Sequence, residues 1–359
     1  MLHKNIFHAI GLMSGSSLDG LDICYVQFTK HDLNFEYEII YADCIEYNNE
    51  FRERLRNAYN LTAFEFAKLH REVGKYFGKL THDFIQKNNI DELDFICSHG
   101  QTIFHQPNLG FTTQIGCGAQ IAAQTNTKVV CDLRTSDVAN CGQGAPIVPV
   151  AEKYLFADYK VFLNIGGIAN IAIHKSEGVI AYDICAANTL LNYFAKQNGL
   201  EYDKNGDLAR SGRINEQLLQ ELNNIDFCKQ AAPKSLGSEH IFTDWIPLFE
   251  KYEISVEDKL ATAVEHIAMQ VEKAIKSQII NLESEMLITG GGAFNSFLVE
   301  RIQHHSNAQV VIPDILTVQN KEALAMAFIG LLRILEIPNC LASVTGAKKD
   351  VVGGAVYLP

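Results

Sequence analysis

The sequence predicts an α/β protein of two domains, each opening with adjacent strands and continuing with helices. The chain has 359 residues, which is more than one hydrophobic core usually organises. Strand-like runs followed by helix-like runs occur twice, starting at residue 6 and again at residue 161. Each opening carries a Gly-rich turn between two strands, and the apolar fraction of 47% supports complete globular folding. A duplicated arrangement of strands and then helices accounts for these observations.

Extended and helical segments alternate through the first half of the chain. An apolar run at 6–10, an alternating run at 23–28 and an extended run at 37–46 predict three strands. A helical stretch follows over 50–89, broken near Asn60, because its second half repeats apolar residues every three or four positions. The segments expected after it are a strand at 93–97, a helix at 119–124, a strand at 128–133 and a helix at 148–156.

The second half repeats the pattern and then becomes mainly helical. The expected segments are strands at 161–165, 168–174 and 179–184, a helix at 188–197, a long helix at 256–280, a strand at 286–289, and two helical segments flanking 310–312. No low-complexity tract or Pro-rich linker interrupts this order.

The turn within residues 10–22 has the chemistry of a phosphate-binding loop. It reads Ile-Gly-Leu-Met-Ser-Gly-Ser-Ser-Leu-Asp-Gly-Leu-Asp. Its glycines permit close backbone approach, its serines offer hydroxyls, and Asp19 and Asp22 offer carboxylates that suit a hard cation. An ordinary Gly/Ser hairpin turn has the same composition, and either aspartate can fix such a turn through an Asx hydrogen bond.

Two later glycine runs favour the phosphate-binding interpretation. One is the turn Asn164–Asn170 between two strands, and the other is Gly290–Gly292, which follows a strand and opens a helix through Asn295. These features predict a nucleotide cleft, in which the two turns face each other as phosphate loops and the glycine run exposes backbone to a nucleoside. The P-loop pattern is absent, and a Rossmann loop would lead into a helix instead of a strand.

Composition excludes several other classes. The net charge is −12 and no basic block occurs, which argues against nucleic acid or an anionic membrane as a partner. Residues 1–10 carry no cleavable leader pattern, and no window approaches the ~20 apolar residues of a membrane span. The nine cysteines include no Cys-x-x-Cys pair, so we expect mostly buried thiols in a reducing, cytoplasmic compartment.

Ordered motifs along nearly the whole chain resemble the anhydro-N-acetylmuramic acid kinase family within the actin-like ATPase superfamily. The blocks are Gly11–Asp22, Ser98–Thr102 with His105 and Pro107, Asp132–Arg134 with Asp137, Gly142–Pro146, Leu163–Asn170, Asp183 and Asn188, Tyr202–Gly206, Pro233–Ser235, Thr289–Asn295, Lys321–Ala323 and Thr345–Ala347.

The resemblance implies a two-lobed fold of duplicated ribonuclease H-like domains with a nucleotide cleft between the lobes. The first lobe would span 1–135 plus 345–359 and the second 136–344. The implied activity uses ATP, Mg²⁺ and water to convert 1,6-anhydro-N-acetylmuramic acid into N-acetylmuramic acid 6-phosphate and ADP, during bacterial cell-wall recycling. Homodimerisation is also carried over from the family.

The resemblance further assigns roles to individual residues. Asp183 is the implied general base that activates water. A helix N-cap carboxylate is the competing explanation for Asp183, since it ends a strand before a helix. The implied ATP-binding residues are Gly15, Ser16, Ser17, Leu18, Asp19, Gly20, Leu21, Asp22, Asn164, Gly166, Gly167, Gly290, Gly291, Gly292 and Asn295, with Asp19 as candidate Mg²⁺ contact. The implied substrate-binding residues are His99, Gln101, Thr102, Arg134, Asn188 and Glu322.

Several of these residues have alternative structural roles. His99 can be a capped structural histidine, and Arg134 can pair with Asp132 or Asp137 instead of a substrate carboxylate. Glu322 lies in an apolar helix, where an unpaired carboxylate is costly and a ligand or partner is implied. Lys234 and Ser235 fit either substrate contact or loop structure.

The chain departs from the family pattern at two places. Ser16 replaces the usual Thr, and Ile184–Ala187 replace a Thr-Gly-Pro segment and the small residue that follows it. The second change alters the allowed backbone angles beside Asp183, so a kinase of the same fold for another amino or anhydro sugar is an alternative function. A non-catalytic nucleotide-gated clamp is a third, although we find no appended peptide-binding domain.

Overall fold

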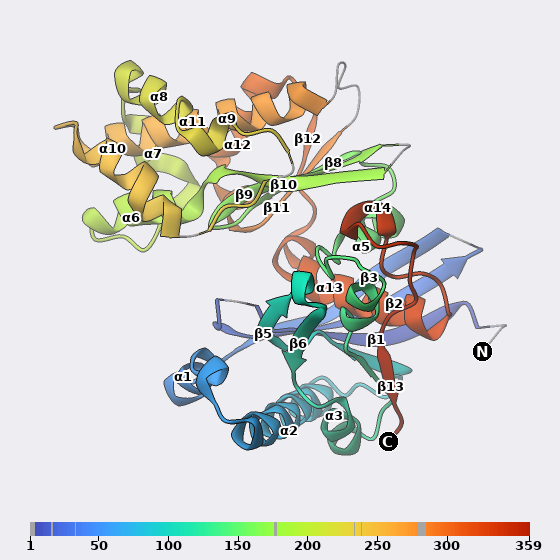
Figure 1. Ribbon diagram of the computed structural model, residues 1–359. Coiled ribbons are helices and arrows are strands. Elements are labelled where there is room, and N and C mark those ends of the chain that lie inside the picture. Colours follow the sequence, from blue (N-terminus) through green and yellow to red (C-terminus); the bar gives the residue numbers. More distant parts are fainter. Residues whose placement is uncertain are drawn as a thin grey trace. The chain divides into compact units, whose positions relative to one another are not determined.

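Two compact units make up the chain. The computed structural model describes residues 4–15, 17–32, 34–175, 178–232, 234–237, 239–278 and 285–359 (Figure 1). The first unit comprises Met1–Ala157 and Asn320–Pro359, and the second comprises Asp158–Gln319. Residues 136–157 and 320–344 thus belong to the first unit, whereas the sequence-based boundaries assign them to the second lobe.

Long-range contacts explain this difference in boundaries. The buried carboxylate of Asp137 accepts the N–H of Gly144 at 2.7 Å and the hydroxyl of Thr345 at 2.7 Å. The loop after residue 136 is therefore tied to the C-terminal segment of the same unit. Nothing in the local sequence pattern reports a bond that spans 208 positions.

The first unit is built on a six-stranded sheet in the order β13-β7-β4-β1-β2-β3. β1, β2 and β3 pair antiparallel, β1 pairs parallel with β4, β4 pairs parallel with β7, and β13 pairs antiparallel with β7. The strands are β1 (Ile6–Met13), β2 (Gly20–His31), β3 (Asn34–Glu46), β4 (Phe95–Ser98), β7 (Val129–Cys131) and β13 (Ala355–Tyr357).

Helices and a small hairpin complete the first unit. Helix α2 begins with a capping box between Thr62 and Glu65, and it buries Val73 and Phe77 against the sheet. The elements are α1 (Asn49–Arg56), η1 (Ala58–Asn60), α2 (Ala63–Lys87), η2 (Pro107–Leu109), α3 (Gly118–Thr125), α4 (Thr135–Ala139), α5 (Pro149–Leu155), α14 (Ala342–Thr345) and the strands β5 (Gln101–Gln106) and β6 (Phe111–Ile115). The β5–β6 hairpin was missing from the sequence prediction.

The second unit repeats the topology of the first. Its sheet order β10-β9-β8-β11-β12 matches β3-β2-β1-β4-β7, with three antiparallel strands followed by two parallel neighbours. The strands are β8 (Val161–Ile165), β9 (Ile168–Lys175), β10 (Gly178–Ala186), β11 (Met286–Thr289) and β12 (Val310–Val311). The predicted duplication is confirmed, since each unit contains the same order of strands in an α/β fold.

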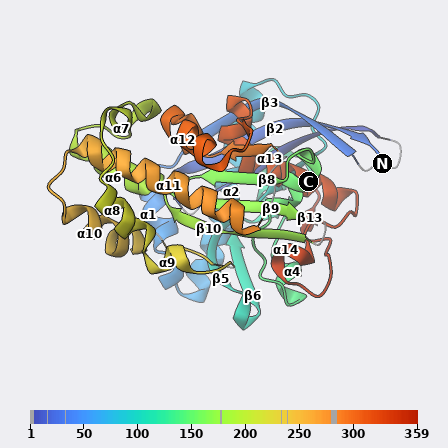
Figure 2. The same ribbon diagram turned by 90° about the horizontal axis from the view of Figure 1, so that it is seen from above.

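Helices of the second unit pack around a large apolar core. The long helix α11 lies across β9 and β10 (Figure 2) and contributes Leu260, Val264 and Ile267 to that core. The helices are α6 (Asn188–Gln197), η3 (Lys204–Gly206), α7 (Asp207–Ser211), α8 (Glu216–Asn223), α9 (Asp226–Lys229), η4 (Ile241–Trp245), α10 (Ile246–Glu250), α11 (Val256–Gln278), η5 (Gly291–Phe294) and α12 (Ser296–Ser306), while α13 (Ile315–Ile334) runs from this unit into the first.

Helix α13 corrects one expectation from the sequence. It has 20 residues with a mean hydropathy of 1.3 in its most apolar window, so it is long and apolar enough to cross a membrane. That window is 72% buried within the protein, and residues such as Phe328 and Leu332 are fully buried. Core helices of globular proteins have the same composition, and α13 is one of them.

All nine cysteines are free thiols, and all except Cys44 and Cys141 are buried. The expectation of mostly buried, unpaired cysteines is therefore confirmed.

Close packing of α13 on the first sheet depends on two glycines. A Cβ at Gly11 of β1 would lie 1.9 Å from the carbonyl oxygen of Ala323, and one at Gly330 would lie 2.5 Å from Cβ of Cys97. The helix can contact β1 and β4 this closely only because neither glycine has a side chain.

A polar network is buried in the second unit. His266 is fully buried, and its Nδ1 lies 2.8 Å from Oδ1 of Asn223. Its Nε2 accepts the indole N–H of Trp245 at 3.2 Å. Because an indole can only donate, the ring proton belongs on Nδ1 and the imidazole is neutral. Burial accordingly lowers the pKa of His266 to about 3.

We expect Gly11→Ala to lower the free energy of unfolding by about 3 kcal/mol or more, because the new methyl group overlaps the α13 backbone. Urea denaturation followed by circular dichroism measures this. Gly110→Ala is the matched control, since its φ is +81° and no atom lies within 4 Å; it should cost only about 1 kcal/mol. Equal effects of both substitutions would contradict the packing argument.

We expect the second unit to lose about 1 kcal/mol of stability between pH 7 and pH 5.5 through His266. The unfolded histidine binds a proton below about pH 6.5, whereas the folded one stays neutral down to about pH 3. Stability is therefore complete above pH 6.5 and falls as the pH falls. Trp245 is the only tryptophan in the chain, so its fluorescence during urea unfolding reports on this unit.

His266→Gln, which can keep both hydrogen bonds, should remove this part of the pH dependence. His240→Gln changes an exposed histidine of the same unit and should leave the pH dependence as it is. An unchanged slope in His266→Gln would refute the assignment.

Candidate functional site

The turn between β1 and β2 is anchored through its backbone. The N–H of Leu18 bonds the carbonyl of Gly15 at 3.3 Å, and the carbonyl of Asp19 accepts bonds from Tyr47 and Arg52. The side chains of Ser17 and Asp19 are exposed, while that of Leu18 is buried. The structure gives the Asp19 carboxylate no hydrogen bond to a described residue, so no Asx bond fixes it. Ser16 lies outside the described residues.

The predicted ATP-binding residues that follow lie in β2. Gly20 is required by packing, since a Cβ there would lie 2.6 Å from the carbonyl oxygen of Ile45. Leu21 is fully buried, so its side chain belongs to the core. Burial raises the pKa of Asp22, a hydrogen bond with Cys44 opposes this, and the nearby Asp19 carboxylate raises it further. Two adjacent carboxylates in this position favour a cation.

A buried chain of hydrogen bonds joins this turn to β5. The hydroxyl of Tyr47 donates to Ser14 Oγ at 2.7 Å, and Ser14 donates to Oε1 of Gln101 at 2.5 Å. All three residues are at most 3% exposed. Gln101 thus fixes the position of the turn relative to β5, and its contact with substrate stays a prediction.

His99 holds the guanidinium of Arg134. Nδ1 of His99 lies 2.9 Å from the carbonyl oxygen of Gly100, and Nε2 accepts from both Nε and Nη2 of Arg134 at 3.0 and 2.9 Å. Burial, followed by the charge of Arg134, lowers the pKa of His99 to about 3. His99 is therefore a neutral acceptor with both ring nitrogens engaged.

Arg134 does not pair with either carboxylate that the sequence offered. Its Nη1 donates to the carbonyl of Gly144 at 2.7 Å, Asp132 accepts from Thr135, and Asp137 accepts from Gly144 and Thr345. Among the described residues, one N–H on Nη1 and one on Nη2 remain without a partner. This guanidinium is fixed in place and keeps donors available for an anion.

Glu322 lies on α13 beside these charges. Its side chain keeps contact with solvent, but the protein atoms around it displace much of the water and raise its pKa. The carboxylate of Asp22 raises the pKa further. Lys321 and Arg134 act in the opposite direction. The sequence predicts a ligand or a partner for this carboxylate, and the positive charges of Lys321 and Arg134 supply part of that partnership.

The β5–β6 hairpin carries a polar network that includes Thr102. Nε2 of Gln114 donates to Thr102 Oγ1 at 3.3 Å and to Thr112 Oγ1 at 2.9 Å. Nδ1 of His105 lies 3.1 Å from the same oxygen of Thr112. The sequence analysis missed Gln114 and Thr112, although alternation of polar residues across a tight hairpin is a readable signal.

In the second unit, the turn after β8 supports the start of α6. The backbone N–H groups of Ala187 and Thr189 donate to the carbonyl of Gly167, and that of Asn188 donates to Gly166. The amide side chain of Asn188 donates to the carbonyl of Ile165 at 3.0 Å. Asn188 thus has a structural role that connects the Gly turn to the helix.

The glycine run after β11 is packed closely against the same turn. Gly290 has φ +82°, and a Cβ there would lie 2.6 Å from Oδ1 of Asn164. A Cβ at Gly292 would lie 2.2 Å from Cγ2 of Ile165, whereas Gly291 is exposed. The side chain of Asn295 accepts the N–H of Leu298 as N-cap of α12. Packing therefore requires glycine at positions 290 and 292, and Gly291 is the most exposed residue of the run.

Asp183 is half-buried within β10, not at the N-cap of α6, which is Ala187. Its Oδ2 accepts the hydroxyl of Ser235 at 3.0 Å and the N–H of Leu236 at 2.8 Å. The N-cap explanation is excluded. Ser235, which the sequence left undecided, contacts the predicted catalytic carboxylate.

The segment that departs from the family pattern, Ile184–Ala187, is at most 2% exposed and belongs to the core of the second unit. A β-bulge lies between Asp183 and Cys185 in the pairing with β9. The altered side chains point into the protein, so any effect on substrate must act through the backbone of this corner.

No group of three or more His, Cys, Asp or Glu side chains that could hold a metal ion occurs in the described part of the chain. A Mg²⁺ that enters with nucleotide needs fewer protein ligands, because phosphates and water complete its coordination. The exposed Asp19 carboxylate beside Asp22 suits such an ion.

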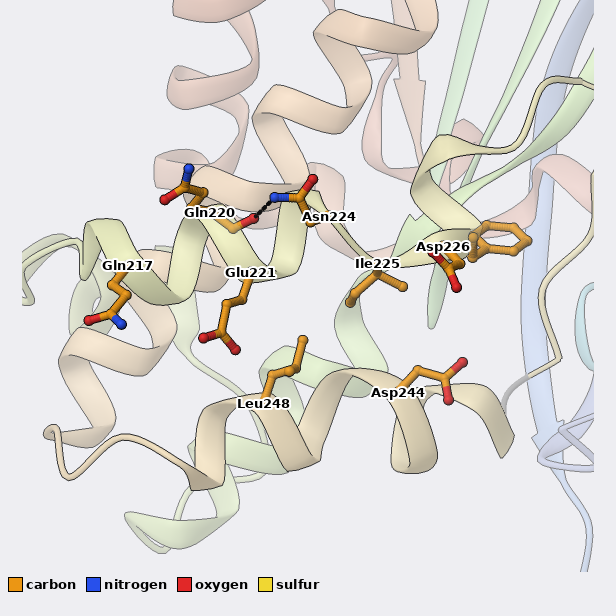
Figure 3. Close-up of a pocket in the computed structure, with 9 residues that line it drawn as sticks. Gln217, Gln220, Glu221, Asn224, Ile225, Asp226, Asp244 and Leu248 are labelled. Carbon is orange, nitrogen blue, oxygen red and sulfur yellow. Dashed lines mark hydrogen bonds between the residues drawn. The ribbon is translucent and has the colours of Figure 1, made fainter.

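A hollow of about 660 Å³ lies in the second unit between α8 and the η4–α10 segment (Figure 3). It includes none of the predicted site residues. Two of its three carboxylates have close partners, since Glu221 contacts Lys251 and Tyr252, and Asp244 contacts Thr243 and His240. The third carboxylate, Asp226, is fully exposed and lies 4.0 Å from Nζ of Lys229, so no buried charge in this hollow is directed at a ligand.

Comparison with known proteins identifies the family. Residues 7–359 match the family model described as anhydro-N-acetylmuramic acid kinase. Curated proteins of that name from Haemophilus influenzae, Pasteurella multocida and Aliivibrio fischeri are 32%, 34% and 35% identical to this chain. The alignments cover 99%, 97% and 97% of this chain, and 99%, 96% and 98% of those proteins.

Similarity to solved structures is much weaker. The Acidaminococcus fermentans (R)-2-hydroxyglutaryl-CoA dehydratase component A has 12% identity and a TM-score of 0.48, covering 89% of this chain and 96% of that one. Such values carry no functional argument. The full-length sequence matches are sufficient, and this chain belongs to the anhydro-N-acetylmuramic acid kinase family.

Proposed function

We propose that this protein uses ATP and water to convert 1,6-anhydro-N-acetylmuramic acid into N-acetylmuramic acid 6-phosphate and ADP. The observation that carries this proposal is the family match over residues 7–359. The intact position of Asp183 supports it, because the reaction needs a base beside the sugar.

Asp183 acts as the general base. It takes a proton from water, the water oxygen bonds to the anomeric carbon, and the bond from that carbon to the bridging oxygen breaks. The freed 6-oxygen then attacks the γ-phosphorus of ATP, and ADP leaves. Water at neutral pH is a poor nucleophile, so the carboxylate supplies the activation.

The phosphates of ATP are bound by the two Gly-rich turns. Exposed Ser17 in the first turn, and Gly166 and Gly167 in the second, supply hydroxyl and backbone donors. Asp19 is the proposed protein contact for Mg²⁺, which spreads the charge on the transferring phosphoryl group when bound. Exposed Gly291 is the proposed backbone contact of the nucleoside.

Arg134 binds the lactyl carboxylate of the sugar. Its guanidinium is oriented by His99 and Gly144, and it keeps two N–H donors for an anion. Burial, followed by the charge of Arg134, lowers the pKa of His105, which contacts Thr112 in the Gln114 network. This network therefore lies near Arg134.

We further propose that the protein is a cytoplasmic homodimer. Light scattering of the purified protein tests the dimer directly.

Two alternatives are separated by measuring substrate and turnover. A panel of amino and anhydro sugars would identify a kinase of the same fold with another preference. A nucleotide-gated clamp would bind ATP without phosphorylating any of them.

Asp183→Asn should lower kcat by about 100- to 10,000-fold, because the amide cannot accept the proton from water. ATP binding, measured by calorimetry, should persist. Asp207→Asn is the control, as it neutralises an exposed carboxylate elsewhere in the second unit. If Asp183→Asn turned over normally, the assignment of the base would be wrong.

Arg134→Lys should raise the KM for the anhydro sugar by about 10- to 100-fold and leave the KM for ATP unchanged, because lysine cannot replace the oriented guanidinium. The same comparison with 1,6-anhydro-N-acetylglucosamine, which lacks the lactyl carboxylate, should show little difference between wild type and variant. An equal loss with both sugars would exclude a carboxylate contact.

A further inference from the structure

A short segment far along the chain surrounds Asp183. The backbone N–H of Asp183 donates to the carbonyl of Lys234 at 3.1 Å, while Ser235 and Leu236 donate to its carboxylate. Three consecutive residues, separated from Asp183 by about 50 positions, thus contact both its backbone and its side chain.

Both donors of this segment bond the same carboxylate oxygen. Ser235 Oγ lies 3.0 Å and Leu236 N lies 2.8 Å from Oδ2. Among the described residues, none donates to Oδ1. The terminal torsion of an aspartate is otherwise broad, so two bonds to one oxygen select a single orientation of the carboxylate. Oδ1 is left as the oxygen that can receive a proton.

The segment itself is held firmly on both sides of Ser235. Leu236 is 5% exposed and packs in the core of the second unit. Nζ of Lys234 donates to the carbonyl of Phe227 at 2.9 Å and lies 4.5 Å from the centroid of the Phe227 ring. Ser235 lies between these two anchors and is exposed, so its hydroxyl can act on Asp183 without supporting the core.

We propose that Ser235 is a positioning residue for the general base. Its hydroxyl and the Leu236 amide hold Oδ2, so that Oδ1 faces the water that attacks the anomeric carbon. The proton moves from water to Oδ1, while both hydrogen bonds to Oδ2 remain. This inference rests on the proposed function.

Ser235→Ala tests the inference directly. It should lower kcat for the anhydro sugar by about 10- to 100-fold, which is the effect of one hydrogen bond to a charged group. The KM for ATP should stay unchanged.

Ser235→Thr retains the hydroxyl and should restore most of the activity. Ser211→Ala is the matched control, because it removes an exposed serine of the same unit that bonds only the carbonyl of Leu208. The melting temperature of each variant separates loss of activity from loss of fold.

The outcomes separate this inference from the function on which it rests. An active wild type with an equally active Ser235→Ala overturns the positioning role alone. A reduced kcat that Ser235→Thr does not rescue also overturns it, since that pattern is structural. A wild type that does not phosphorylate the anhydro sugar overturns both.

Discussion

The direction of the strands determines where the candidate site residues lie in each of the two sheets. In each unit the first strand pairs in parallel with the fourth, through β1 with β4 and β8 with β11. Leu12 is in register with Ser98, and Asn164 with Thr289. The carboxyl ends of these strands therefore meet at one edge of each sheet, and the chain leaves that edge through the Gly-rich turns, through His99 and through Gly290.

The third strand of the second unit follows the same rule. β10 is antiparallel to β9, which is antiparallel to β8, so β10 runs in the direction of β8. Asp183 stands opposite Asn170, at the beginning of β9 and next to the second Gly turn. A carboxylate near the end of β10 thus reaches the same edge as the proposed phosphate-binding turn, without any long loop to carry it there.

Regular periodicity in the sequence made much of this fold predictable. The features that could not be predicted depend mainly on long-range contacts. The strand β8 and the helix α6 have the predicted bounds, because a short apolar run and a three- or four-residue spacing are local properties of the sequence. The β5–β6 hairpin was missed because its strands are short and polar. The unit boundary depends on contacts such as Asp137 with Thr345, which no sequence window contains.

The candidate site, like the fold, was predicted only in part. Residue types and motif order pointed to Asp183 and Arg134, but only the structure excludes the N-cap role of Asp183 and removes Asp132 and Asp137 as partners of Arg134. His99 and Gln101 are predicted substrate contacts, and the structure shows both of them in buried hydrogen bonds to protein groups. Histidine and glutamine side chains can bond either a substrate or protein groups, so the residue type alone does not show which of the two roles each has.

The departure at Ile184–Ala187 is best understood through the bulge. Ile184 and Cys185 are adjacent and both buried, whereas strict alternation along a strand would expose one of them. The bulge between Asp183 and Cys185 resolves this conflict, since the extra residue lets both apolar side chains enter the core. Apolar residues here stabilise the bulge from the core side, while the loop containing Ser235 holds the carboxylate from the other. The orientation of Asp183 therefore depends on two independent supports, neither of which requires the Gly-Pro backbone that the family usually has.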